Sequence, residues 1–85
     1  MKMRSDGVSW QELDGELVLL DLATSAYLTT NEAGTLLAKT LVDGTNREAL
    51  VDALVSTYRI DDERARADVD DFLRQLRERG LLVDG

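Results

Sequence analysis

The sequence predicts an α+β domain in which a three-stranded antiparallel meander is followed by three α-helices. Short apolar runs separated by turn residues fill residues 8–30, and they have the length of strands. Apolar residues then recur at helical spacing as far as residue 79. A chain of 85 residues suits one domain, so we expect residues 1–7 to be a flexible N-terminal tail and residues 8–85 a single folded unit.

The central strand is the apolar run Leu17–Leu22, which only Asp21 interrupts. A run this continuous indicates a strand covered on both faces. Before it, Val8–Leu13 predicts a first strand with Val8, Trp10 and Leu13 pointing inward. Asp14–Gly15 predicts a two-residue hairpin between the two strands, because glycine tolerates the positive φ of a type I′ turn.

A third, shorter strand is predicted at Ala26–Thr29, after a turn at Ala23–Ser25. In a meander this strand lies at a border of the sheet, with a row of unpaired backbone groups on its free side. It contains no Pro, Lys or Glu to discourage pairing. Short border strands are common, however, so this feature has two readings: an ordinary sheet border, or a surface that pairs with another chain.

Three helices are predicted from their capping residues and apolar spacing. Asn31 is a candidate N-cap for a first helix over Glu32–Val42. Thr45 and Glu48 have the spacing of a capping box at the start of a second helix, whose predicted buried stripe is Leu50, Ala53, Leu54 and Tyr58. Asp61 or Asp62 can cap a third helix that runs to about Arg79 and stops at Gly80.

The third helix has an asymmetric apolar band. With Ala65 at 0° and steps of about 100°, Val69, Phe72 and Leu76 form the core stripe, and Leu73 lies at about 80°. Leu73 widens the band towards the side that carries Arg66, Asp70 and Arg77. Leu73 either covers a neighbouring helix or contributes to a binding surface.

Composition argues against catalysis and nucleic-acid binding. The chain has no cysteine and no histidine, which removes thiol nucleophiles and the commonest general base. Its acidic residues near Asp61–Asp71 lack the spacing of a calcium loop, and neither GxGxxG nor GxxxxGK[ST] occurs. We therefore expect no enzyme activity, no metal and no cofactor.

A net charge of −7 disfavours phosphate neutralisation and hence nucleic-acid binding. No apolar run reaches membrane-spanning length and no signal core follows Met1–Arg4, so a cytoplasmic protein is expected.

An ordered set of motifs resembles the PqqD-like family of leader-peptide recognition domains, which are winged helix-turn-helix-like. The resemblance covers about Trp10 to Val83. Its motifs are Gly15-Glu16, Val18–Leu22, Tyr27, Asn31 and Gly34, then Leu41, Gly44, Thr45 and Leu50, and finally Phe72–Leu82. The family commonly has a leucine directly before the asparagine and a bulky aromatic residue in the next helix. This chain has Thr30 and the pair Leu36-Leu37 at these places.

The resemblance implies that the chain binds the leader of a ribosomally made precursor peptide. The leader would add as a strand to the third strand, in a cleft whose other wall is the third helix. The residues expected at this site are Ala26, Tyr27, Leu28 and Thr29 on the strand, Val69 and Leu73 on the cleft floor, and Arg66, Asp70, Arg74 and Arg77 on its rim.

The resemblance also implies partners. The chain looks most like the stand-alone leader-binding protein of lasso-peptide biosynthesis, whose partners are a leader-cleaving cysteine protease and a cyclase; we expect a monomer. Two alternatives remain open: a PqqD-type peptide chaperone for a radical enzyme of quinone-cofactor biosynthesis, and an acidic winged-helix protein that acts in transcription through protein contacts.

Overall fold

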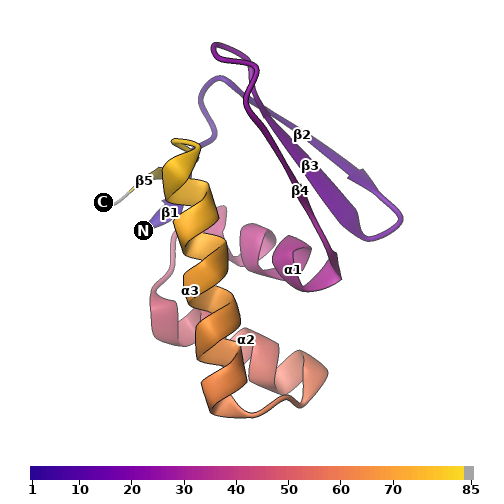
Figure 1. Cartoon of the computed structure of the whole chain (residues 1–85), viewed down its shortest axis with the longest axis vertical. Helices are drawn as coiled ribbons and strands as arrows, with labels where there is room; N and C mark the ends of the chain where they lie inside the picture. The colour runs from indigo at the N-terminus through magenta and orange to yellow at the C-terminus, as the bar shows by residue number, and fades with distance from the viewer. Residues whose placement is uncertain (84–85) are drawn as a thin grey trace.

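The structure is a computed structural model that describes residues 1–83. Strands β2 (Val8–Leu13), β3 (Glu16–Asp21) and β4 (Tyr27–Thr30) form an antiparallel sheet in the order β2-β3-β4. Helices α1 (Glu32–Leu41), α2 (Arg47–Tyr58) and α3 (Asp62–Glu78) follow (Figure 1). The predicted meander and three helices are confirmed. None of the helices in residues 1–83 combines the length and apolar composition needed to cross a membrane.

The β2–β3 hairpin closes with the predicted turn. Asp14 and Gly15 have φ values of 53° and 80°, as a type I′ turn requires, and Leu13 lies opposite Glu16. The inward position predicted for Leu13 is wrong. Its side chain is 59% exposed, because alternation along the strand puts it on the face opposite to Val8 and Trp10.

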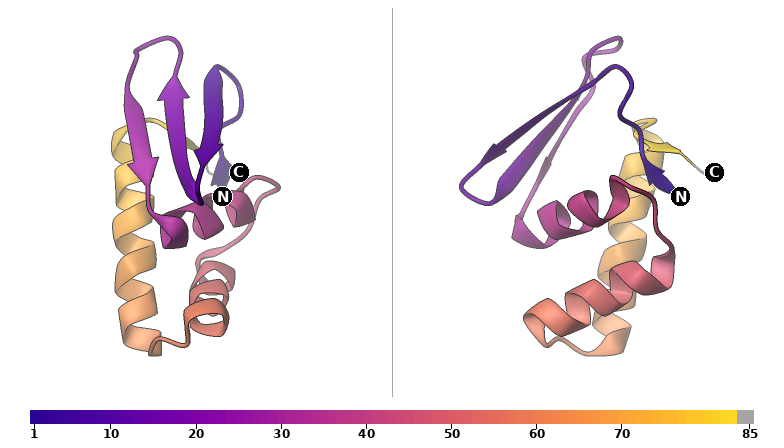
Figure 2. Two further views of the ribbon diagram at one scale, coloured as in Figure 1. Left: turned by 90° about the vertical axis from the view of Figure 1, so that its right-hand side faces the viewer. Right: turned by 180° about the vertical axis from the view of Figure 1, so that it is seen from behind.

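The sheet buries one face and leaves the other open. Leu17 and Leu19 are buried, whereas Val18 and Leu20 are half-buried by their neighbours in the sheet. Leu22, just after β3, is 63% exposed. The prediction that both faces of the central strand are covered is therefore wrong for the part of the chain that the structure describes. Helices α1 and α3 lie beside the sheet, and α2 packs on α1 and α3 (Figure 2).

Side-chain caps start each helix. The Asn31 side chain accepts from the Gly34 amide at 2.8 Å, and the Asp61 side chain accepts from the Arg64 amide at 2.7 Å, as predicted. The capping box at Thr45 is wrong by one residue. Asn46 is the N-cap of α2, and its side chain accepts from the Ala49 amide at 2.9 Å.

The core lies where α1, α2 and α3 meet the sheet. The predicted stripe residues of α3, Val69, Phe72 and Leu76, are buried, and so are Ala65 and Leu73. On α2, Leu50 and Leu54 are buried as predicted, but the predicted Tyr58 is 39% exposed and Val51 takes its place in the core.

The N-terminal segment differs from the loose tail expected for residues 1–7. Lys2–Met3 form β1, which pairs antiparallel with β5 (Leu82–Val83), and the Met3 side chain is only 2% exposed. The Arg4 amide donates to the Leu81 carbonyl at 2.8 Å. The two ends of the described chain thus lie side by side (Figure 1). A two-residue strand has no periodicity to reveal it, and its partner is about 80 residues away in sequence.

Candidate functional site

A groove of about 310 Å³ runs between β4 and α3. Figure 2 (left) shows β4 as the strand of the sheet on the side of α3. The groove residues are Leu28, Thr29, Thr30 and Asn31 from β4 and the residue after it, Ala33, Gly34 and Leu37 from α1, Leu54 from α2, and Arg64, Asp68, Asp71, Phe72 and Gln75 from α3. The lining is apolar at the base and polar along α3, which is the composition of a binding site for an amphipathic ligand.

The base of the groove depends on a close approach between α1, β4 and α3. A Cβ atom on Gly34 would lie 2.9 Å from Thr30 Cβ and 3.4 Å from Phe72 Cε1. Only glycine fits at this position without displacing its neighbours. The absence of a side chain at Gly34 therefore brings β4 close enough to α3 for the two to share one groove.

The border of β4 presents unpaired backbone groups. The Asp21 amide donates to the Ala26 carbonyl at 2.8 Å, so these two residues form a hydrogen-bonded pair across β3 and β4. Backbone direction alternates along an antiparallel strand. The N–H and C=O groups of Leu28 therefore point to β3, whereas those of Tyr27 and Thr29 point away from the sheet. Since β4 ends the sheet order, no strand of residues 1–83 pairs with this side.

One contact confirms this direction independently. The Arg79 Nε donates to the Tyr27 carbonyl at 3.1 Å, from the side of α3. Arg79 is the C-cap of α3 and also donates through Nη1 to the Gln75 carbonyl at 3.3 Å. The outward carbonyl of Tyr27 is thus held by a side chain rather than by a strand. This link joins the C-terminal end of α3 to β4.

The α3 wall of the groove carries carboxylates in its middle. Asp71 accepts hydrogen bonds from Arg74 and from Gln75, and these bonds hold the pKa of Asp71 below its usual value. Asp68 is weakly paired, with 3.9 Å between its Oδ2 and Arg64 Nε. The wall therefore carries two carboxyl groups, each next to an arginine, above an apolar base.

Thr30, which stands where the family commonly has leucine, is buried and fully bonded. Its hydroxyl accepts from the Leu17 amide at 3.3 Å and lies 2.8 Å from the Thr35 hydroxyl, to which it donates when Thr35 donates elsewhere. Thr35 in turn donates to the Asn31 carbonyl at 2.9 Å. The buried pair Thr30–Thr35 therefore links the end of β4 to α1.

The structure brings only part of the predicted site to the groove. Leu28 and Thr29 line it, Tyr27 lies at its end, and Ala26 faces β3 through its backbone. The α3 residues predicted for the floor and rim lie elsewhere on the helix: Val69 and Leu73 are buried in the core, Arg66 and Asp70 contact α2, Arg74 pairs with Asp71 and Glu78, and Arg77 is exposed. Sequence reasoning missed Arg64, Asp68, Asp71, Phe72 and Gln75 as the groove side of α3.

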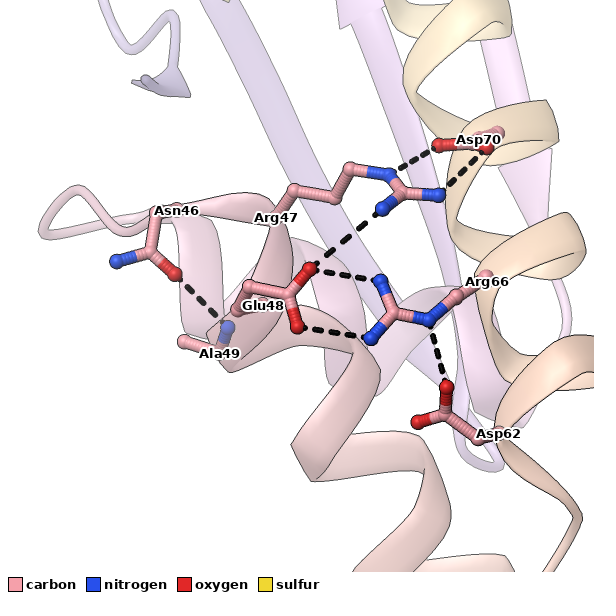
Figure 3. A network of polar contacts seen from close by, with 7 residues as sticks. All are labelled: Asn46, Arg47, Glu48, Ala49, Asp62, Arg66 and Asp70. Carbon is pink, nitrogen blue, oxygen red and sulfur yellow. Dashed lines mark hydrogen bonds and ion pairs between the residues drawn. The ribbon is translucent and has the colours of Figure 1, made fainter.

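Arg66 and Asp70 belong to a network that joins α2 to α3 (Figure 3). Arg66 donates to both Glu48 oxygens, at 2.7 and 3.0 Å, and Arg47 donates to both Asp70 oxygens, at 2.6 and 2.9 Å. These bonds lower the pKa of Glu48 and of Asp70 and raise that of Arg66. Both predicted rim residues are thus committed to holding α3 against α2.

Comparisons with known proteins agree with this architecture. The family model described as coenzyme PQQ synthesis protein D (PqqD) matches residues 16–82. Among solved structures, TbiB1 in complex with the TbiA(beta) leader peptide is 34% identical, with a TM-score of 0.84 over 99% of this chain and 100% of that chain. Lasso peptide synthetase B1 complexed with the leader peptide is 25% identical, with a TM-score of 0.82 over 98% and 96%. No curated protein matches the chain. Because the family model spans most of its length, the chain belongs to the PqqD family.

Proposed function

We propose that the chain binds the leader region of a ribosomal precursor peptide, without catalysis, and presents it to the protease that removes the leader in lasso-peptide biosynthesis. The leader adds as a fourth strand to β4. The observation that carries this proposal is the outward backbone of Tyr27 and Thr29 beside a groove with an apolar base. Main-chain bonds to a border strand supply affinity for any extended peptide, and adjoining pockets choose among side chains.

The binding set proposed from the geometry differs from the one expected from sequence. Tyr27 and Thr29 offer main-chain bonds, and Phe72, Leu28 and Leu37 receive an apolar side chain of the leader. Asp68 and Asp71 lie along the rim. Two structures at 34% and 25% identity that contain leader peptides, both with TM-scores above 0.8, support a leader as the occupant.

Charge argues against nucleic acid as the occupant. The net charge is −7, and the groove itself carries Asp68 and Asp71. A nucleic-acid site would need cations to neutralise phosphates, and its affinity would fall steeply with salt. A leader held by main-chain bonds and apolar contacts would show little dependence on salt.

A PqqD-type role with a radical enzyme is the second candidate, because the matching family model is named for coenzyme PQQ synthesis. Of the two solved structures that resemble the chain over nearly its full length, one is instead a lasso peptide synthetase B1, and both contain a leader peptide. Affinity capture from the native host discriminates between the two. We expect a precursor peptide and a cysteine protease to be retained; a radical enzyme in place of the protease would favour the second candidate.

The experiment that tests strand addition is a proline substitution at the border. Thr29→Pro removes the outward N–H of Thr29 without removing a bond to β3, and border strands tolerate such a proline. Thr29→Val keeps the N–H and serves as the matched control. With the captured precursor peptide, we expect at least about a tenfold loss of affinity for T29P, since one main-chain bond and the local strand geometry are lost together, and about none for T29V. Equal affinities with native circular dichroism for both variants would refute strand addition.

A second measurement does not depend on the proline variant folding. Amide hydrogen exchange of the wild-type chain reports the outward amides of Tyr27 and Thr29 directly. Both should exchange fast in the free chain and slowly with peptide bound, because the added strand accepts their bonds. Slow exchange confined to residues outside β4 would place the peptide elsewhere.

A further inference from the structure

Arg79 is a cation that the fold leaves without a carboxylate beside the groove. Its guanidinium contacts only two main-chain carbonyls, those of Tyr27 and Gln75, and no carboxylate of residues 1–83 lies within 4.0 Å of it. By contrast, Arg47, Arg64, Arg66 and Arg74 each have at least one carboxylate partner. Arg59 and Arg77 also lack a carboxylate within 4.0 Å among residues 1–83, but of these three arginines only Arg79 donates to a backbone carbonyl of β4.

Arg79 holds the backbone group that an added strand would use. The Tyr27 carbonyl points away from β3 and accepts from Arg79 Nε. A peptide that pairs along β4 from Thr29 to Tyr27 offers its own N–H to that carbonyl. The guanidinium is then released at the end of the bound strand, within reach of the peptide's side chains.

We propose that Arg79 is a specificity-determining residue that selects a carboxylate side chain in the bound peptide, at the end of the strand next to Tyr27. This inference rests on the proposed function. The exchange is favourable because an N–H of the peptide replaces Arg79 at the Tyr27 carbonyl, while the Arg79 guanidinium exchanges a neutral acceptor for a carboxylate of opposite charge. The middle of the α3 wall has two lining carboxylates, Asp68 and Asp71, and one lining cation, Arg64, which is already paired with Asp68, so it offers an acidic side chain no free cation. The acidic position in the peptide is therefore confined to the Arg79 end.

Selection from a displayed library of random 12-residue peptides tests the proposal without a known ligand. The library is selected against the wild-type chain and against R79Q, R79E and R77E. Arg77 is the matched control, since it lies two residues earlier, is exposed, and has no carboxylate within 4.0 Å among residues 1–83. Circular dichroism establishes whether each variant is folded. If R79E does not fold, R79Q decides the test, because glutamine keeps amide donors at this position.

The expected result is a fixed pattern in the wild-type pool: an apolar anchor, with Asp or Glu enriched at one spacing from it. R79Q should lose the acidic preference, R79E should replace it with Lys or Arg, and R77E should match the wild type. In a selected peptide, replacing Asp by Asn should weaken wild-type binding about two- to fivefold, the range of an exposed ion pair, and leave R79Q binding unchanged.

Two failures are distinguishable. If no variant and no wild-type selection enriches any peptide, the proposed function itself is overturned. If peptides are enriched and T29P abolishes their binding, but the acidic preference is absent or is the same for R79Q and the wild type, strand addition stands and the role of Arg79 is overturned.

Discussion

Asp21 joins three segments that are distant in sequence. Its carboxylate pairs with Arg4 Nη2 at 2.8 Å and accepts from the Ala23 amide at 3.0 Å, which forms the turn between β3 and β4. Arg4 also donates to the Gly80 carbonyl at 2.9 Å, directly after α3. Hydrogen bonds from Arg4 and from the Ala23 amide hold the pKa of Asp21 below its usual value. One carboxylate therefore fixes the N-terminal segment and the end of α3 relative to the β4 turn.

We expect Asp21→Asn to lower stability at pH 7 and to weaken its acid dependence. The pKa of Asp21 is lower in the folded state than the roughly 3.9 of an unfolded chain, so its contribution is fully present above that value. The contribution is lost as pH falls through the folded pKa. The difference in urea midpoint between wild type and D21N should therefore shrink from pH 7 to pH 3.

The control for this prediction is Asp52→Asn, an exposed carboxylate on α2 without an ion pair among the described residues. The urea midpoint of D52N should differ little from that of wild type at every pH. If the difference in urea midpoint between wild type and D21N stays constant down to pH 3, Asp21 does not contribute to stability through its charge.

At the scale of elements, local signals were predictable from sequence and the orientation of α3 was not. The positive φ at Asp14 and Gly15 and the caps at Asn31 and Asp61 follow from neighbouring residues alone. The error at Thr45 arose because Asn46 is an equally good cap one position later. The buried stripe of α3 was also correct, because it depends on spacing within one helix.

Which flank of the stripe faces β4 depends on contacts far away in sequence. Counting about 100° per residue from Ala65, the groove residues Arg64, Asp68, Asp71, Phe72 and Gln75 fall between about 240° and 340°. The sequence-based choice followed Leu73 to the opposite flank, at about 80° to 140°. Leu73 instead completes the core, being 3% exposed. A helical wheel gives the width of an apolar band, but not which neighbour covers each of its sides.

The two flanks of α3 can be separated by experiment. The double variant Glu48→Gln/Asp70→Asn removes the carboxylates that anchor Arg66 and Arg47 (Figure 3). We expect a lower thermal midpoint at low salt and a smaller difference from wild type in 1 M salt, where charges are screened. Affinity for the precursor peptide should stay within about twofold, because the network lies away from the groove.

Glu63→Gln is the control, since Glu63 is an exposed residue of the first turn of α3 without an ion pair in residues 1–83. E63Q should have a thermal midpoint and an affinity for the precursor peptide close to those of wild type. A tenfold loss of peptide affinity in the double variant, with unchanged circular dichroism, would assign binding to the flank of Arg66 and Asp70 instead.

At the scale of the whole molecule, pairing of the chain ends joins elements that are distant in sequence. The Met1 amino group donates to the Thr45 carbonyl at 3.1 Å, and the Thr45 amide donates to the Met1 carbonyl at 2.8 Å. With β1 paired to β5, these bonds tie the start of the chain to the α1–α2 connection and to the end of α3. A domain of 85 residues buries a small core, so the loss of one buried side chain from these segments should be measurable.

Met3→Ala tests this contribution against a neighbour on the same strand. Met3 is 2% exposed in the main core, and truncating a buried methionine costs about 2–5 kcal/mol, a large part of the 5–15 kcal/mol typical of small domains. Lys2 alternates to the exposed face of β1, so Lys2→Ala should cost no more than about 0.5 kcal/mol. Urea denaturation measures both. If M3A were as stable as K2A, residues 1–7 would act as the loose tail expected from sequence.

If M3A is destabilised as expected, the peptide affinity of its folded fraction should still equal that of wild type, because β1 contributes no residue to the groove.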